Sequence, residues 1–135
     1  NYYLCKNYEM NCPCCSGKQY TECCEPYHKS EKPAPNAEAL MRSRYCAYAI
    51  PNGAYLMKTT LPTMRPFHSK EEMHEWGEIN QWIQLEIISK PTASKVEFKA
   101  HYIDEDGIKQ VHHELSNFKK IQSNWFYVDG EFYES

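Results

Sequence analysis

The sequence of 135 residues lacks an apolar run of the roughly 18 residues that a membrane-spanning helix needs, and no signal-peptide core is visible. It also lacks an excess of charge of one sign, with 15 Lys and Arg against 18 Asp and Glu. A nucleic-acid-binding protein usually carries a basic surface, so we expect neither a nucleic-acid nor a membrane partner. Only five glycines are present, and none belongs to a phosphate-binding loop.

Cysteine, in contrast, is abundant, with seven residues in the chain. An odd number without a secretory signal favours a reducing compartment, so we expect a cytoplasmic protein. Cysteines in such a compartment usually bind metal, take part in chemistry or pack in the core. Five of the seven lie between Cys12 and Cys24, in the stretch CPCCSGKQYTECC. We interpret the other two, Cys5 and Cys46, as structural.

The chain divides into two parts at the proline-containing segment EKPAPN. Residues 1–33 are polar and lack a sustained hydrophobic period, so they cannot bury much apolar surface. Such a segment needs a bound metal or a cross-link in order to fold. Residues 34–135 contain helix patterns first, over 37–50, 54–60 and 70–82, with Asn36 and Ser69 as N-caps. Strand patterns follow over 83–90, 95–103, 108–121 and 125–128. Helices followed by an antiparallel meander predict an α+β domain.

The cysteine-rich stretch has the spacing of a metal site. Cys12-x-Cys14 and Cys23-Cys24 supply four thiolates in two short pairs, which can surround a tetrahedral zinc ion. Lys18 can offset the negative charge of such a site. A disulfide within either pair would be strained, although bridges between the pairs remain an alternative. We expect zinc, and a four-cysteine iron–sulfur cluster is the alternative metal group that thiolates suit.

The same stretch resembles the SEC-C motif, a small zinc module first noticed at the C-terminus of the SecA translocation ATPase. The motif reads C-P-C-x-S-G-K-x-Y-x-x-C followed by His or Cys. The resemblance implies that the metal ligands are Cys12, Cys14, Cys23 and Cys24. One position departs from the motif, because Cys15 stands where a glycine is usual. A cysteine adopts positive φ poorly, so the turn can differ here, and Cys15 can be a competing ligand, a spare thiol or an exposed bystander.

The remainder of the chain resembles the YchJ-type proteins, which carry an N-terminal SEC-C module. The segments that carry this resemblance are PYH (26–28), AEALMRSRYCAY (37–48), YLMKTT (55–60), HELSNF (113–118) and WFYVDG (125–130). The resemblance implies that residues 34–135 form a nuclear-transport-factor-2-like domain. In that fold the helices pack on a curved antiparallel sheet and leave a cone-shaped cavity. It implies no biochemical role, because the role of the family is undefined.

Three polar residues are candidates for a site in that cavity, namely Arg44, His112 and Glu114. Arg44 lies near the apolar stripe of its helix and needs a carboxylate partner, for which Glu114 is the best candidate. We favour a structural ion pair that fixes the helix on the sheet. The alternative is an anion or substrate site on Arg44 with Glu114 as a base. His112 and His113 are adjacent on a strand, so only one of them can face the cavity.

Three classes of function are compatible with these features. We favour an adaptor whose SEC-C module docks a protein partner, since the SecA module is an interaction element and a closed four-cysteine site leaves no position for catalysis. The alternative is a small-molecule-binding protein or enzyme that uses the cavity. The third class is redox sensing through Cys15 and the cluster. Domains of this fold often pair through the outer sheet face, so a homodimer is a further expectation.

Overall fold

The computed structural model describes residues 11–134, so Cys5 lies outside the described residues. Helical elements come first and strands follow, which confirms the predicted α+β class. The elements are η1 (Tyr20–Glu22), α1 (Glu25–His28), α2 (Ala37–Ala49), α3 (Gly53–Lys58), η2 (Pro62–Phe67), α4 (Lys70–Ile79), β1 (Gln81–Thr92), β2 (Lys95–Ile103), β3 (Lys109–Ile121) and β4 (Asn124–Tyr133). Within this part of the chain, no helix is long and apolar enough to span a membrane.

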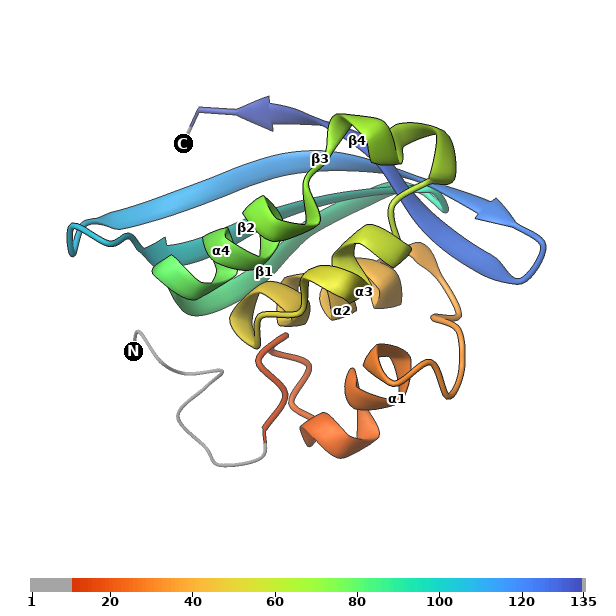
Figure 1. Cartoon of the computed structure of the whole chain (residues 1–135), viewed down its shortest axis with the longest axis horizontal. Coiled ribbons are helices and arrows are strands. Elements are labelled where there is room, and N and C mark those ends of the chain that lie inside the picture. The colour runs from red at the N-terminus through yellow and green to blue at the C-terminus, as the bar shows by residue number, and fades with distance from the viewer. Residues whose placement is uncertain (1–10, 135) are drawn as a thin grey trace.

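The four strands form one antiparallel sheet in the order of the sequence. The pairing of β1 with β2 shifts register at three places, and that of β3 with β4 shifts once, between Asn117 and Phe118. Such irregularities bend and twist a strand. Figure 1 shows the curved sheet over helices α2, α3 and α4, with α1 and the segment before it on the far side of α2.

Helix α2 occupies the centre of the molecule and is buried on nearly every side. Its N-cap is Asn36, whose side chain accepts a hydrogen bond from the Ala39 N–H at 2.8 Å, as predicted. The sequence indicated one apolar face that includes Ala47, yet Ser43 and Cys46 outside that face are also fully buried. The sheet covers one side of the helix, α3 another, and the N-terminal module a third.

Helix α4 ends at Ile79, three residues earlier than the sequence pattern indicated. The side chain of Asn80 donates to the carbonyl of Trp76 at 2.9 Å and so ends the helix. Trp82 is therefore a residue of β1 and is only 2% exposed. Its indole N–H donates back to the carbonyl of Gly77 at 3.0 Å, which fixes the corner between helix and sheet.

The facing of β3, which the sequence alone left ambiguous, is clear in the structure. Phe98 of β2 pairs with Glu114, and the inward side chains of β3 include Glu114 and Phe118, both buried. His112 lies on this same inward face, whereas His113 lies on the outer face and bonds to Glu97 at 2.7 Å. One histidine of the pair therefore faces the helices, as the strand geometry required.

Candidate metal centre and cavity

The four cysteines of the predicted metal site converge at the N-terminal end of the described chain. The sulfur atoms of Cys12, Cys14, Cys23 and Cys24 all lie within 4.8 Å of one another. Cys14 and Cys23 are 3.6 Å apart, and Cys23 and Cys24 are 3.9 Å apart. Around a tetrahedral zinc ion with bonds of about 2.3 Å, the sulfur atoms would be about 3.8 Å apart. The cluster therefore fits a single tetrahedral metal ion.

A cation is needed if all four sulfurs are to be thiolates together. Close contact with Cys12 is the largest cause that raises the pKa of both Cys14 and Cys24 far above the usual range of a thiol. The physical reason is that the protonated thiols of Cys14 and Cys24 can donate hydrogen bonds to Cys12, and burial also disfavours their charged forms. A divalent metal would replace these protons, so metal binding would release them.

Hydrogen bonds support the cluster from the loop and from α2. The hydroxyl of Ser16 lies 3.2 Å from the sulfur of Cys23, where it can donate to a thiolate. Arg42 brings a positive charge near the site, because it donates to the Cys14 carbonyl at 2.7 Å. Lys18, the expected source of positive charge, is exposed and lines the same hollow as Arg42, Cys23 and Cys24.

Cys15 adopts the left-handed conformation with φ 66°, so the replacement of the usual glycine does not force a different turn. The residue is half-buried and stands outside the four-sulfur group. Its sulfur accepts a hydrogen bond from the Leu85 N–H of β1 at 3.4 Å. Cys15 therefore helps to seat the metal module on the sheet and is not an exposed bystander.

Two further side chains, Cys46 and His28, join the module to α2, and neither contact could be predicted from a local pattern. Cys46 packs as expected, but its sulfur is only 3.9 Å from that of Cys12. His28 donates from Nε2 to the carbonyl of Ser43 and accepts at Nδ1 from the hydroxyl of Tyr20, each at 2.8 Å. Burial is the main cause that lowers the pKa of His28, so the ring is neutral.

We expect His28→Ala to lower the free energy of unfolding by about 2 kcal/mol near neutral pH, because two buried hydrogen bonds are lost. Since the unfolded histidine takes up a proton more readily than the folded one, this stabilisation is present above about pH 6.5 and is lost at lower pH. Urea denaturation at about pH 7.5 and about pH 5.5 should therefore show a smaller difference at the lower pH. An equal difference at both values would contradict a buried neutral ring.

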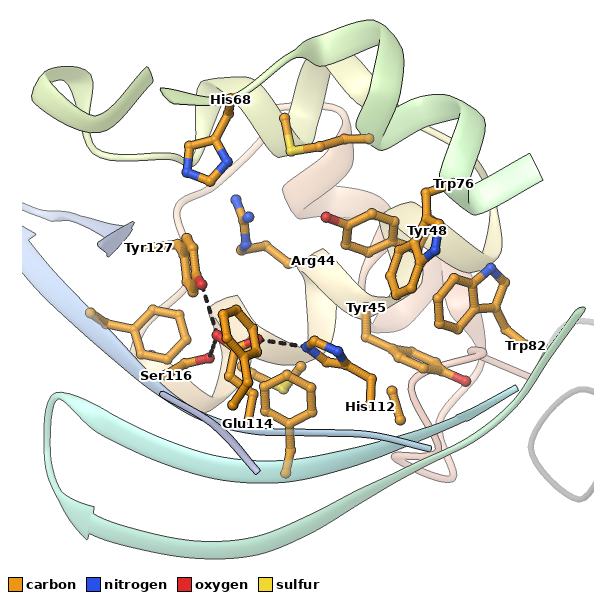
Figure 2. Close-up of a pocket in the computed structure, with 16 residues that line it drawn as sticks. Arg44, Tyr45, Tyr48, His68, Trp76, Trp82, His112, Glu114, Ser116 and Tyr127 are labelled. Atoms are coloured by element: carbon orange, nitrogen blue, oxygen red, sulfur yellow. Dashed lines mark hydrogen bonds and ion pairs between the residues drawn. The ribbon is translucent and has the colours of Figure 1, made fainter. Parts of the chain in front are cut away.

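The second candidate site is a cavity of about 220 Å³ enclosed by α2, α4 and the sheet. Figure 2 shows that its walls are mainly aromatic. Arg44, His112 and Glu114, the three candidates from the sequence, all line it. Other lining residues are Met41, Tyr45, Tyr48, His68, Met73, Trp76, Trp82, Phe98, Ala100, Ser116, Phe118, Tyr127 and Phe132.

The carboxylate of Glu114 is buried and accepts three hydrogen bonds. His112 Nε2 donates to one oxygen at 2.8 Å, while the hydroxyls of Ser116 and Tyr127 donate to the other at 2.7 Å each. Burial opposes ionisation and is the largest single effect, but the three donors outweigh it and lower the pKa of Glu114. Glu114 is therefore an anion held by three donors, rather than the isolated carboxylate that the sequence pattern indicated.

Arg44 does not form the predicted ion pair with Glu114, because Tyr127 stands between them. The guanidinium carbon lies 4.6 Å from the centre of the Tyr127 ring, whose hydroxyl bonds to Glu114. Nη1 of Arg44 donates instead to the Leu56 carbonyl at 2.8 Å and the Thr59 hydroxyl at 2.7 Å. Across residues 11–134, this guanidinium, only 7% exposed, makes no ion pair with a carboxylate.

The polar side chains of the cavity lie apart from one another in a wall that is otherwise mainly apolar. Figure 2 shows the guanidinium of Arg44 between His68 and Tyr127, with His112 and Glu114 below. Burial, and after it the positive charge of Arg44, lower the pKa of His68, so that ring is neutral. The arrangement suits a small molecule with a flat apolar body and one acidic group.

Comparison with known proteins agrees with both parts of the chain. The family described as "YchJ, middle NTF2-like domain" matches residues 36–130. A "UPF0225 protein" of Actinobacillus succinogenes is 42% identical over 123 residues, which cover 87% of this chain and 79% of that protein. Another from Geobacter sulfurreducens is 41% identical over 125 residues, covering 88% and 77% respectively.

Solved structures with the same fold come from two further bacteria. The solution structure of a SEC-C motif containing protein from Rhodopseudomonas palustris has a TM-score of 0.83 and 37% identity, covering 93% of this chain and 100% of that one. The crystal structure of such a protein from Psychrobacter arcticus has a TM-score of 0.75 and 32% identity, covering 92% and 83%. The expected nuclear-transport-factor-2-like domain with a SEC-C cysteine cluster is confirmed, and this chain belongs to the YchJ family.

Proposed function

We propose that the cone-shaped domain binds a small organic anion in its cavity, and that zinc in the four-cysteine site holds the N-terminal module on α2. The observation that carries the proposal is Arg44, a buried charge without a carboxylate partner among the described residues, in the wall of an aromatic cavity. A buried charge is costly unless an opposite charge accompanies it. A bound carboxylate would supply that charge.

The size of the cavity limits the ligand to a small molecule. Its volume of about 220 Å³ is below the range of about 300–1,000 Å³ that is usual for drug-sized ligands. A single-ring acid such as benzoate is a suitable probe. Its ring would contact aromatic walls such as Tyr48 and Phe98, and its carboxylate would meet the nitrogen atoms of Arg44 that Leu56 and Thr59 do not occupy.

Arg44→Met should weaken benzoate binding by about tenfold to a hundredfold, which is the loss expected for hydrogen bonds to a charged group. Stability should change little, because the Leu56 carbonyl still accepts from the Thr60 hydroxyl at 2.9 Å and a buried charge is removed. Isothermal titration calorimetry with benzoate and thermal denaturation of the same samples measure the two effects separately.

Arg65→Met is the matched control. Arg65 also bonds to backbone carbonyls at the end of α3, those of Thr60 and Lys58 at 3.0 Å each, but it does not line the cavity. We expect it to leave benzoate affinity unchanged. Wild-type protein that binds no benzoate, or an Arg44→Met variant that binds it as tightly as wild type, would contradict the proposed function.

Zinc is the metal that we propose for the cysteine cluster. Four sulfurs from one chain fill a tetrahedral shell and leave no open position, which is typical of a structural zinc ion. The metal would then stabilise the module and take no part in a reaction. Elemental analysis that finds iron together with sulfide would identify an iron–sulfur cluster instead.

The adaptor role that we favoured from the sequence stays a proposal for the metal module. The support for it is the loop tip Gly17, Lys18 and Gln19, which is exposed beyond the buried sulfurs. A pull-down with wild-type protein and a Lys18→Glu variant would test whether a partner depends on this tip. The homodimer through the outer sheet face is likewise a proposal, which sedimentation equilibrium would test.

A further inference from the structure

We propose that His112 is a general base, oriented by Glu114, that removes a proton from the small molecule held in the cavity. The proposal rests on the proposed function for the binding step and adds a chemical step to it. Glu114 is a positioning residue here, because one of its oxygens holds His112 and the other is held by Ser116 and Tyr127.

The tautomer of His112 follows from its contact with Glu114. Nε2 lies 2.8 Å from a carboxylate that can only accept, so the ring proton is on Nε2. The lone pair of the neutral ring is then on Nδ1. No residue in the described range forms a hydrogen bond with Nδ1, and the side chain is 29% exposed. His112 therefore lines the cavity and has a basic nitrogen, Nδ1, to which no described residue donates.

The surroundings of His112 favour proton transfer at this nitrogen. The rings of Trp76, Phe98 and Phe132 have their centres 5.9, 6.0 and 5.3 Å from that of His112. These rings leave His112 only partly exposed, and the nearest charged group to it is the Glu114 carboxylate, which would stabilise a positive charge on the imidazole. Other titratable or charged side chains in the cavity wall are Arg44, Tyr45, Tyr48, His68 and Tyr127.

Glu114 can orient His112 because its own position is fixed. Ser116 of the same strand and Tyr127 of β4 hold the second oxygen. The backbone of Gly130, also on β4, passes so close that a Cβ atom there would lie 2.0 Å from the carboxylate. A base held in this way keeps one orientation when a ligand enters, which is what general-base catalysis requires.

A second histidine–carboxylate pair shows why the cavity matters. His113 bonds to Glu97 at 2.7 Å, as short as the His112 contact, but this pair lies on the outer face of the sheet. Neither His113 nor Glu97 lines the cavity in which we propose that the small molecule binds. His113 therefore provides an internal comparison with the same chemistry and a different location.

The proton transfer needs no co-reactant. Nδ1 takes the proton of a C–H bond, and the electron pair of that bond stays in the bound molecule. The positive charge of Arg44 on another wall offsets the negative charge that develops (Figure 2). Return of the proton to a different carbon gives an isomer, and expulsion of a leaving group with its electron pair gives an elimination.

The test uses 5-nitrobenzisoxazole, a small aromatic molecule, with the full-length, metal-loaded protein. A base removes its C–H proton, the electrons of that bond form a nitrile, and the N–O bond breaks to leave a coloured phenolate. We expect catalysis above that of free imidazole at equal concentration. His112→Ala should lose about a hundredfold and Glu114→Gln about tenfold in rate, whereas His113→Ala should match wild type.

Two controls separate this proposal from the proposed function and from misfolding. Circular dichroism and benzoate binding show whether His112→Ala is folded and still binds a ligand. If benzoate binds but His112→Ala and wild type react equally fast, or no rate exceeds free imidazole, the base is overturned while the binding function stands. In wild-type protein, ¹⁵N NMR should show neutral His112 protonated at Nε2, with this preference weakened in Glu114→Gln. A neutral ring protonated at Nδ1 would overturn the proposal without any variant.

Discussion

Cys14→Ser should remove zinc from the protein and lower the free energy of unfolding by more than about 4 kcal/mol, a size reached when a structural metal is lost. Cys14 is completely buried, and its sulfur lies 3.6 Å from that of Cys23. A serine hydroxyl does not replace a thiolate as a zinc ligand. The cluster cysteines share one core with Leu40 and Trp82, so the loss of stability should extend from the metal module to the rest of the fold. Elemental analysis and urea denaturation measure the two effects.

Cys46→Ser is the control for this prediction. The Cys46 sulfur is also fully buried and lies 3.9 Å from that of Cys12, but it is not a member of the four-sulfur group. We expect this variant to keep one zinc per chain, with a smaller loss of stability from the buried hydroxyl. Full zinc content in Cys14→Ser, or its loss in Cys46→Ser, would show that the ligand set is wrong.

Gly130→Ala should lower the free energy of unfolding by about 2–4 kcal/mol, although only a methyl group is added. The new Cβ would lie 2.0 Å from an oxygen of Glu114 and 2.7 Å from its Cγ. The carboxylate would have to move and break its bonds to Ser116 and Tyr127, which leaves a charge buried without its donors. Urea denaturation of both proteins measures the loss, and benzoate affinity reports on the cavity.

Asp129→Ala provides the comparison for Gly130→Ala at the neighbouring position of β4. It removes only an exposed hydrogen bond of 2.8 Å to Asn117, so its effect should stay within about 0.5 kcal/mol. A Gly130→Ala protein as stable as Asp129→Ala would contradict the close contact between the strand and the Glu114 carboxylate.

Helix α2 connects the two sites. The carbonyl of Ser43 and the side chain of Cys46 contact the metal module, while Arg44 and Tyr48 line the cavity. These residues are neighbours on one short helix, so a change in the packing of the module against α2 would also move the residues of α2 that line the cavity. If the cluster holds zinc as proposed, removal of the metal with a chelator should therefore weaken benzoate binding, although the four cysteines do not line the cavity.

Much of the fold could be predicted from local patterns. Asn36 and Ser69 cap their helices as expected, with bonds of 2.8 and 3.1 Å to backbone N–H groups. The alternation of apolar and polar residues predicted strands β2 and β3. The spacing of the cysteines predicted the four residues whose sulfur atoms lie close together. These features succeeded because each depends on residues close together in the chain or on a strongly constrained spacing.

The parts that could not be predicted depend on contacts distant in the chain. Arg44 and Glu114 are an obvious pair by charge, yet Tyr127 from the last strand separates them. The end of α4 depends on where the Trp82 indole packs, and local propensity does not report that. The role proposed for His112 depends on which face of β3 points to the helices, and the sequence does not decide this because both faces of that strand carry apolar residues.

Ligand binding in the cavity can be tested most directly by NMR of the methionine methyl groups labelled with ¹³C. Met41 and Met73 line the cavity, whereas Met57 and Met64 do not and serve as controls in the same spectrum. Benzoate should shift the Met41 and Met73 signals in a saturable manner and leave those of Met57 and Met64 in place. Unchanged Met41 and Met73 signals at high benzoate concentration would contradict an anion-binding cavity.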